Sequence, residues 1–215
     1  MSEVEALFKQ TIQASDLSAK QQAVLQASLD LFAAQGFDRT TSSEIAARAG
    51  VSEGTVYKKF KTKKGIFDAL MTPFLDAIVP RVTTEFAAEV QAQTFADFAA
   101  FLQYLIANRM AFVLANHQQI KIFAQEIISQ PNIMTTLATH WQQLLAGPLG
   151  AQLDAYKAQQ QLVDWTNVRI AQYIGSTIAG YMAPQILLPD AAPVDVDVQS
   201  QAATEFLLRG LAPEA

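Results

Sequence analysis

Apolar residues recur three or four positions apart along most of the chain, which is the spacing of one face of an α-helix. Near the N-terminus, Val4, Leu7, Phe8 and Ile12 form such a face. No stretch alternates apolar and polar residues convincingly enough to indicate a strand, and no hairpin dipeptide separates two apolar runs. The pattern therefore predicts an all-α protein.

Four short helices with clear boundary signals are predicted between residues 18 and 70. Each begins with a Ser or Thr that can cap its N-terminus: Ser18, Thr41, Ser52 and Thr62. Glu44 follows Thr41 by three residues, which is the spacing of a capping box. Gly36 and Gly50 should end the first two helices. Residues 1–17 are expected to form an N-terminal arm that packs on the protein or frays.

Longer helices are predicted beyond Pro80. They are expected at about residues 94–116, 117–129, 131–159, 164–183 and 195–211. Gly147 and Pro148 should kink or split the third of these helices. Residues 170–189 carry no charged side chain, but polar side chains and Pro184 interrupt the apolar run. We therefore expect a buried helix there and no membrane span.

The charge of the chain is unevenly distributed. Residues 39–64 contain seven Lys or Arg and two acidic residues, a net charge of +5, although the whole chain of 215 residues carries −5. Such a basic segment on an acidic protein indicates that one face contacts a polyanion. The chain has no cysteine, which excludes disulfides and thiolate metal sites and is compatible with the cytoplasm.

The segment from Thr40 to Phe60, TTSSEIAARAGVSEGTVYKKF, has the pattern of a helix-turn-helix. Ala46 is small where two helices cross, and Gly50 gives the turn its backbone freedom. Ser52 begins the second helix, which is the helix that enters the DNA major groove in this motif. Phe60 is expected in the core.

With its flanking helices, the segment ASLDLFAAQGFDRTTSSEIAARAGVSEGTVYKKFKTKKGIFDALM resembles the N-terminal signature of the tetracycline-repressor (TetR) family. The match covers about residues 24–71, and the rest of the chain resembles the family only in its length and helical content. The resemblance implies a helix-turn-helix DNA-binding domain over residues 18–70 and a helical ligand-sensing and dimerisation domain over residues 71–215. It also implies a regulator, in the family's usual mode a repressor, that binds a palindromic operator as a homodimer.

Candidate DNA contacts follow from the motif and from the chemistry of its side chains. They are Arg39, Thr41, Ser42, Ser52, Glu53, Gly54, Thr55, Tyr57, Lys58, Lys59, Thr62, Lys63 and Lys64. Tyr57 and Lys63 match family positions that imply phosphate contacts. Thr55, Lys58 and Lys59 are candidates for base edges, because lysine can donate to guanine. Gly54 would allow DNA to approach the helix closely.

Some of these residues have other interpretations. Tyr57 could be a packing aromatic residue, and Lys63 and Lys64 could be solvated surface lysines. Cations in the first turn of a helix are unfavourable unless an anion is bound, and this favours the phosphate interpretation. Glu53, Lys59 and Lys64 depart from the residues common in the family, so the operator sequence cannot be predicted.

The sensing domain offers only candidates for a ligand site. They are Phe98, Phe101, Tyr104, Met110, His117, Trp141 and Tyr173, and core packing is the alternative for each. An apolar, aromatic lining would suit a small hydrophobic or aromatic effector.

The dimer interface is expected on the last two helices. Its candidate residues are Ile170, Ala171, Ile174, Gly175, Ile178, Ala179, Val198, Ala202, Phe206 and Leu207. Two helices from each protomer would form a four-helix bundle. The alternative is that these stripes pack inside one monomer.

Two other classes of protein compete with a DNA-binding regulator. A helical ligand-binding or interaction protein without DNA binding would leave the basic segment unexplained. An enzyme is disfavoured because the sequence lacks common catalytic motifs and has only two histidines. We therefore expect no catalytic residues, no metal site, no cofactor and no membrane partner.

Overall fold

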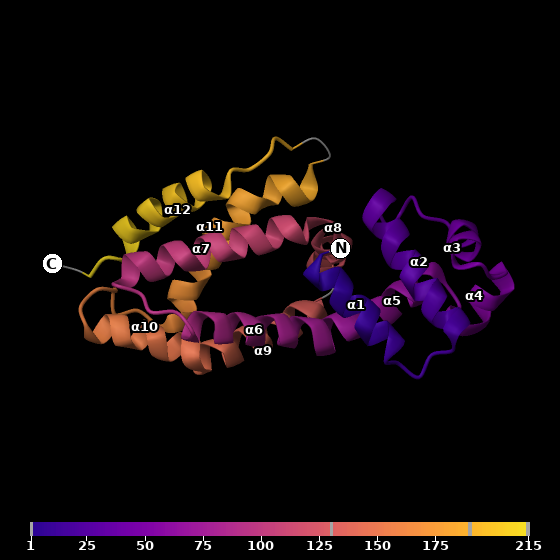
Figure 1. The fold of residues 1–215 in the computed structure, drawn as a ribbon, viewed down its shortest axis with the longest axis horizontal. Helices are drawn as coiled ribbons and strands as arrows, with labels where there is room; N and C mark the ends of the chain where they lie inside the picture. The colour runs from indigo at the N-terminus through magenta and orange to yellow at the C-terminus, as the bar shows by residue number, and fades with distance from the viewer. Residues whose placement is uncertain (1, 130, 189–190, 214–215) are drawn as a thin grey trace. The chain divides into compact units, whose positions relative to one another are not determined.

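A computed structural model describes residues 2–129, 131–188 and 191–213, and describes side chains throughout except at 125–129, 131–132 and 134. The described residues form α-helices and one π-helical turn, with no strand among them (Figure 1). The helices are α1 (Glu3–Gln13), α2 (Ala19–Gln35), α3 (Ser42–Ala49), α4 (Glu53–Phe60), α5 (Lys63–Pro73), α6 (Val79–Gln91), α7 (Phe98–Ala115), α8 (His117–Ser129), α9 (Pro131–Ala146), α10 (Pro148–Ala158), α11 (Asn167–Leu187) and α12 (Val196–Leu211). The predicted all-α class is confirmed.

The chain folds as two compact units. The first contains residues 1–81 and 116–136, and the second contains residues 82–115 and 137–215. This division differs from the predicted boundaries at residues 17 and 70, because α1 and α8 both pack on the core of the first unit. Phe123 of α8 stacks on Phe74 at a centroid distance of 4.2 Å and on Phe8 of α1 at 5.4 Å.

The short helices of the first unit begin and end where the caps predict. The Thr41 hydroxyl accepts a hydrogen bond from the backbone of Glu44, and the Glu44 carboxylate accepts one from the Thr41 backbone. Gly36 and Gly50 end α2 and α3 with φ values of 85° and 67°, which side chains disfavour. Local capping chemistry therefore fixes the lengths of α2 and α3.

The N-terminal arm is a packed helix. Val4, Leu7, Phe8 and Ile12 of α1 are all buried. The backbone N–H of Val4 donates to the Asn116 amide oxygen at 2.9 Å, and the Asn116 side chain is itself buried. The amphipathic pattern predicted this packing, but the partner lies more than a hundred residues away in the sequence.

A helical path continues from α5 into α6 through the π-helical turn η1 (Phe74–Ile78). The sequence pattern placed the end of the fourth helix near residue 70 and the start of the next helix at about residue 94. Helix α6 was therefore not predicted. Proline removes a backbone donor and crowds the preceding turn, so Pro73 and Pro80 look like helix breakers. Here Pro73 is the last residue of α5, and a wider π-turn follows it.

Helices α7, α11 and α12 contact one another in the core of the second unit; α7 and α12 run side by side in Figure 1, and α11 crosses them obliquely. Gln103 of α7 donates to the Ser200 hydroxyl of α12 at 2.8 Å. Among the described residues, only α7 is long and apolar enough to cross a membrane. Its buried side chains belong to the core: Phe98, Phe101, Leu102, Leu105, Ile106 and Met110. Burial of these side chains is typical of a helix in a protein core.

The remaining helix boundaries are close to those predicted. Gly147 separates α9 from α10, and Pro148 is the first residue of α10, so the predicted split is confirmed. Helix α11 begins at Asn167, because Thr166 caps it, and not at Asp164. It also continues through Pro184 to Leu187, past the end predicted at residue 183.

Candidate nucleic-acid interface

Helix α4 has one buried edge and one exposed face. Val56 and Phe60 are 1% and 7% exposed and hold the helix against the rest of the first unit. Tyr57, Lys58 and Lys59 point outward, with Tyr57 43% exposed. The core position predicted for Phe60 is confirmed. The geometry presents an aromatic hydroxyl and two cations together on the second helix of the motif.

The beginning of α4 is held by Ser52. Its hydroxyl accepts from the Thr55 backbone N–H at 3.3 Å and lies 3.0 Å from the Thr55 hydroxyl. Glu53 and Gly54 are exposed beside this cap, and Thr55 is half-exposed. All of the residues that the sequence assigned to the first turn of α4 therefore lie on or beside its outward face.

The carboxylate of Glu44 is engaged in the N-cap of α3. It accepts from the Thr41 backbone N–H at 2.7 Å, from the Thr41 hydroxyl at 2.8 Å and from Gln35 at 3.2 Å. These hydrogen bonds, that from the Thr41 backbone first, lower the pKa of Glu44 below its ordinary value. Thr41 is thus engaged as the N-cap, while Ser42 is the first residue of α3.

The cations of the basic segment differ in how they are used by the protein. Arg39 donates from Nε to the Gln35 carbonyl, Arg48 pairs with Asp30 at 3.5 Å, and Lys64 pairs with Asp68 at 3.0 Å. No partner of the Lys58 or Lys59 ammonium is found in the described part of the chain. These two ammonium groups on α4 are therefore the ones most available to a ligand.

Lys63 lies differently from the other lysines. Its side chain is half-buried, and its Nζ donates to three backbone carbonyls in the loop between α2 and α3. The sequence assigned this ammonium to a phosphate. In the structure the ammonium donates its hydrogen bonds to these carbonyls, and the contact with phosphate stays a prediction. Thr62 caps α5 through the Gly65 N–H at 2.9 Å, as predicted.

The predicted ligand-site residues lie in different surroundings. Phe98, Phe101 and Met110 are at most 2% exposed and belong to the core of the second unit. Both phenylalanine rings contact the Tyr156 ring, at centroid distances of 5.5 and 5.4 Å. Tyr104 packs against the same core and is partly buried. For these residues the structure favours the alternative of core packing.

The other ligand candidates are at the surface. Trp141 is 52% exposed and Tyr173 45% exposed. His117 is exposed at the start of α8, in the first unit, whereas the other six candidates are in the second. The ligand site over these seven residues stays a prediction. An apolar or aromatic side chain on a helix gives no sign of whether it faces a cavity, the core or solvent.

The predicted dimer stripe divides between the core and the surface of the second unit. Ile170, Ile174, Ile178 and Leu207 are at most 9% exposed and lie in the core of their own unit. The other candidates are exposed or half-exposed: Ala171, Gly175, Ala179, Val198, Ala202 and Phe206. The isoleucines recur every four residues, so α11 turns them inward and presents its opposite edge outward.

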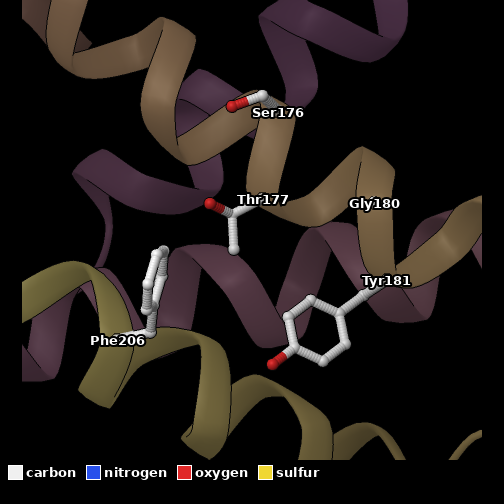
Figure 2. Close-up of a pocket in the computed structure, with 5 residues that line it drawn as sticks. All are labelled: Ser176, Thr177, Gly180, Tyr181 and Phe206. Carbon is white, nitrogen blue, oxygen red and sulfur yellow. The ribbon is translucent and has the colours of Figure 1, made fainter.

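That outward edge borders an open groove of about 420 Å³. Ser176, Thr177, Gly180 and Tyr181 of α11 and Phe206 of α12 line it (Figure 2). Figure 2 shows the Phe206 ring and the Tyr181 ring, which come from different helices, on either side of Thr177. The sequence pattern did not single out Ser176 or Thr177. Once the isoleucines are taken as the core face, their positions on the helix follow.

In the part of the chain that the structure describes, no three His, Asp or Glu side chains lie together in a way that could hold a metal ion.

Comparison with known proteins finds a family match for part of the first unit. Residues 24–70 match the model of the "Bacterial regulatory proteins, tetR family". The transcriptional repressor KstR2 of Rhodococcus jostii is 25% identical over 189 residues, which are 80% of this chain and 90% of that protein. The HTH-type transcriptional regulator YvkB of Bacillus subtilis is 41% identical over 49 residues, which are 23% of this chain and 26% of that protein.

Solved structures share the fold over most of the chain. A TetR-family regulator from Mesorhizobium loti has a TM-score of 0.64 at 18% identity, covering 90% of this chain and 96% of that one. FadR of Bacillus subtilis, solved in complex with stearoyl-CoA, has a TM-score of 0.56 at 21% identity, covering 87% of this chain and 97% of that one. Both likenesses concern the fold.

Proposed function

Because residues 24–70 match the model of the tetR family of bacterial regulatory proteins, we propose that the chain is a cytoplasmic, ligand-responsive DNA-binding regulator of transcription. The observation that carries the proposal is the exposed face of α4, where Tyr57, Lys58 and Lys59 lie together on the second helix of the motif. Repression is the proposed mode, because the relative KstR2 is a transcriptional repressor. We assign the protein no catalytic role.

In this proposal α4 enters the major groove. The Tyr57 hydroxyl and the ammonium of Lys64 contact phosphates, while Thr55, Lys58 and Lys59 face base edges. Arg39, Ser42 and Glu53 remain candidates at the margin of this surface, and the caps Thr41, Ser52 and Thr62 hold the helices that present it.

Gel-shift titrations with genomic fragments test the proposal. The double variant Lys58→Gln/Lys59→Gln should lose specific binding, because both free cations of α4 are removed. Lys121→Gln, which removes an exposed cation from α8, is the matched control and should bind as the wild type does. Specific binding that survives the double variant would show that α4 does not contact DNA.

We also propose a two-fold dimer through the outward face of α11 and α12. Phe206 is 68% exposed, Val198 57% and Tyr173 45%, so this surface places large apolar side chains in water unless a partner covers them. Two copies would present two α4 helices to the two half-sites of a palindromic operator. Four of the residues first chosen for the interface lie in the core, so the exposed edge replaces them.

Sedimentation of a charged variant tests the dimer. A Cβ added at Gly175 would meet no atom within 4 Å, so Gly175→Glu should leave the monomer folded. Combined with Phe206→Glu, it should give a helical monomer that no longer binds a palindrome. Gln142→Glu, which adds one negative charge at an exposed position of α9, should stay dimeric. A double variant that still dimerises would locate the interface elsewhere.

The effector is proposed to be a small hydrophobic or aromatic molecule held by the second unit. The interior of that unit is apolar, and FadR, which shares the fold, is solved with stearoyl-CoA. Binding must lower operator affinity through a difference in affinity for the two states of the protein. Mass spectrometry of the purified protein should identify a bound compound whose addition releases DNA. A tightly bound compound without effect on DNA affinity would contradict this coupling.

A further inference from the structure

The ammonium of Lys63 is surrounded by backbone oxygens. It donates to the carbonyls of Phe37 at 2.8 Å, Asp38 at 3.2 Å and Thr40 at 3.0 Å. An ammonium group has three hydrogens, so these three bonds use all of its donors. The same Nζ lies 4.4 Å from the centroid of the Phe37 ring, within the range of a cation–π interaction. One side chain thus binds three residues of the loop that joins α2 to α3.

This arrangement explains a charge that is otherwise badly placed. The backbone of Lys63 opens α5, and a positive charge is unfavourable in the first turn of a helix. The flexible side chain carries the charge away from that turn to the C-terminal end of α2, where carbonyl oxygens make a positive charge favourable. A bound phosphate is therefore not needed to account for a lysine at this position.

The loop that Lys63 holds determines how α3 begins. Thr40 is 1% exposed, and the next residue, Thr41, is the N-cap of α3. The Phe37 ring packs edge-on against Phe32 of α2 at 5.2 Å and against Phe67 of α5 at 5.3 Å. Lys63 and Phe37 together connect the end of α2, the start of α3 and the first turns of α5.

We propose that Lys63 is a positioning residue for DNA binding and not a phosphate ligand: it fixes the α2–α3 loop and so the orientation of α3 and α4. This rests on the proposed function of the first unit. A lysine that binds phosphate and a lysine that positions the loop differ in their response to salt. Removing one lysine–phosphate ion pair changes the slope of log K against log [salt] by about 0.9 for B-form DNA, whereas removing a positioning residue leaves the slope unchanged.

Lys63→Met tests the proposal, because it keeps most of the alkyl chain and removes the ammonium. Lys64→Met is the matched control one residue away, where the side chain is exposed and ion-paired at the surface. Operator affinity is measured against KCl concentration at a temperature where circular dichroism shows each variant folded, and Tm is measured separately. Lys63→Gln, a neutral variant that keeps two donors, serves if Lys63→Met does not fold.

For Lys63→Met we expect a lower Tm and about a tenfold loss of affinity at every salt concentration, with the wild-type slope. For Lys64→Met we expect the wild-type Tm and a slope smaller by about 0.9 per protomer. A slope that falls by that amount in Lys63→Met or Lys63→Gln would overturn the proposal, as would wild-type Tm and affinity. If the wild type binds no DNA, the proposed function fails, while the Tm comparison still tests whether Lys63 holds the loop.

Discussion

Gly54 lies in the first turn of α4 with free space around it, so Gly54→Ala separates the stability of the helix from its contact with DNA. A Cβ at this position would have the Ser52 hydroxyl oxygen, 3.8 Å away, as its nearest neighbour. Glycine costs a helix interior about 1 kcal/mol relative to alanine, and a position in the first turn should recover about half of that. For a chain of this size, 1 kcal/mol corresponds to roughly 2–4 °C in Tm.

We therefore expect Gly54→Ala to raise Tm by about 1–2 °C. If DNA approaches the backbone of α4 as closely as proposed, the added methyl group should lower operator affinity about tenfold or more in the same protein. Gln142→Ala is the control, because Gln142 is an exposed residue of α9 at which alanine is also the better helix former. Calorimetry and fluorescence anisotropy measure the two effects.

Two results would refute this reasoning. A Gly54→Ala protein with a lower Tm would show that the position is not free in the unbound molecule. A variant that binds the operator as tightly as the wild type would show that DNA does not lie against this turn. Gln142→Ala should change Tm without changing affinity, and a similar loss of affinity there would point to an indirect effect.

Three further changes have expected outcomes. Asn116→Ala leaves the buried N–H of Val4 without its acceptor and should cost about 1–3 kcal/mol in urea unfolding, with faster amide exchange in α1; an unchanged midpoint would contradict this. Gly65→Ala would place a Cβ 2.1 Å from the Phe60 carbonyl oxygen, so the backbone must shift and about 1–3 kcal/mol should be lost, which a wild-type urea midpoint would disprove. The pKa of Glu44 is lowered on folding from an ordinary value of 4.5, so its contribution is complete above that pH and is lost as the pH falls through the folded pKa. Glu44→Gln should therefore lose stability less steeply than the wild type below about pH 4.5, as followed by Tm against pH, and parallel curves would rule the contribution out.

The short helices of the first unit could be predicted because their boundaries are set by neighbouring residues. Thr41, Ser52 and Thr62 each cap a helix with their own hydroxyl group, and Gly50 ends α3 with a positive φ. These interactions span three or four residues, so the sequence contains all of the information. The outward face of α4 followed from the same spacing, because Val56 and Phe60 mark its buried edge.

Features that depend on distant residues could not be predicted. Nothing near Phe123 indicates that α8 packs on α1 and η1, and Pro73 gave a breaker signal that a π-turn accommodates. The position of the Lys63 ammonium could not be predicted either, because a backbone position does not determine where a long, flexible side chain carries its charge. On α11 nearly every face is apolar, so periodicity could not decide which of Ile174 and Gly175 faces the core.

The first unit is built from two separate segments of the chain, and this limits where the chain can be truncated or fused to a relative. The chain passes between its units at three points, after residues 81, 115 and 136. A fragment that stops near residue 81 would lack Phe123, whose ring covers Phe8, Phe67 and Phe74. Those rings would be left in water, and the fragment would be prone to aggregate. A chimaera that joins the first unit of this chain to the second unit of a relative therefore needs residues 116–136 as well as the N-terminal helices. The two segments have to be grafted separately.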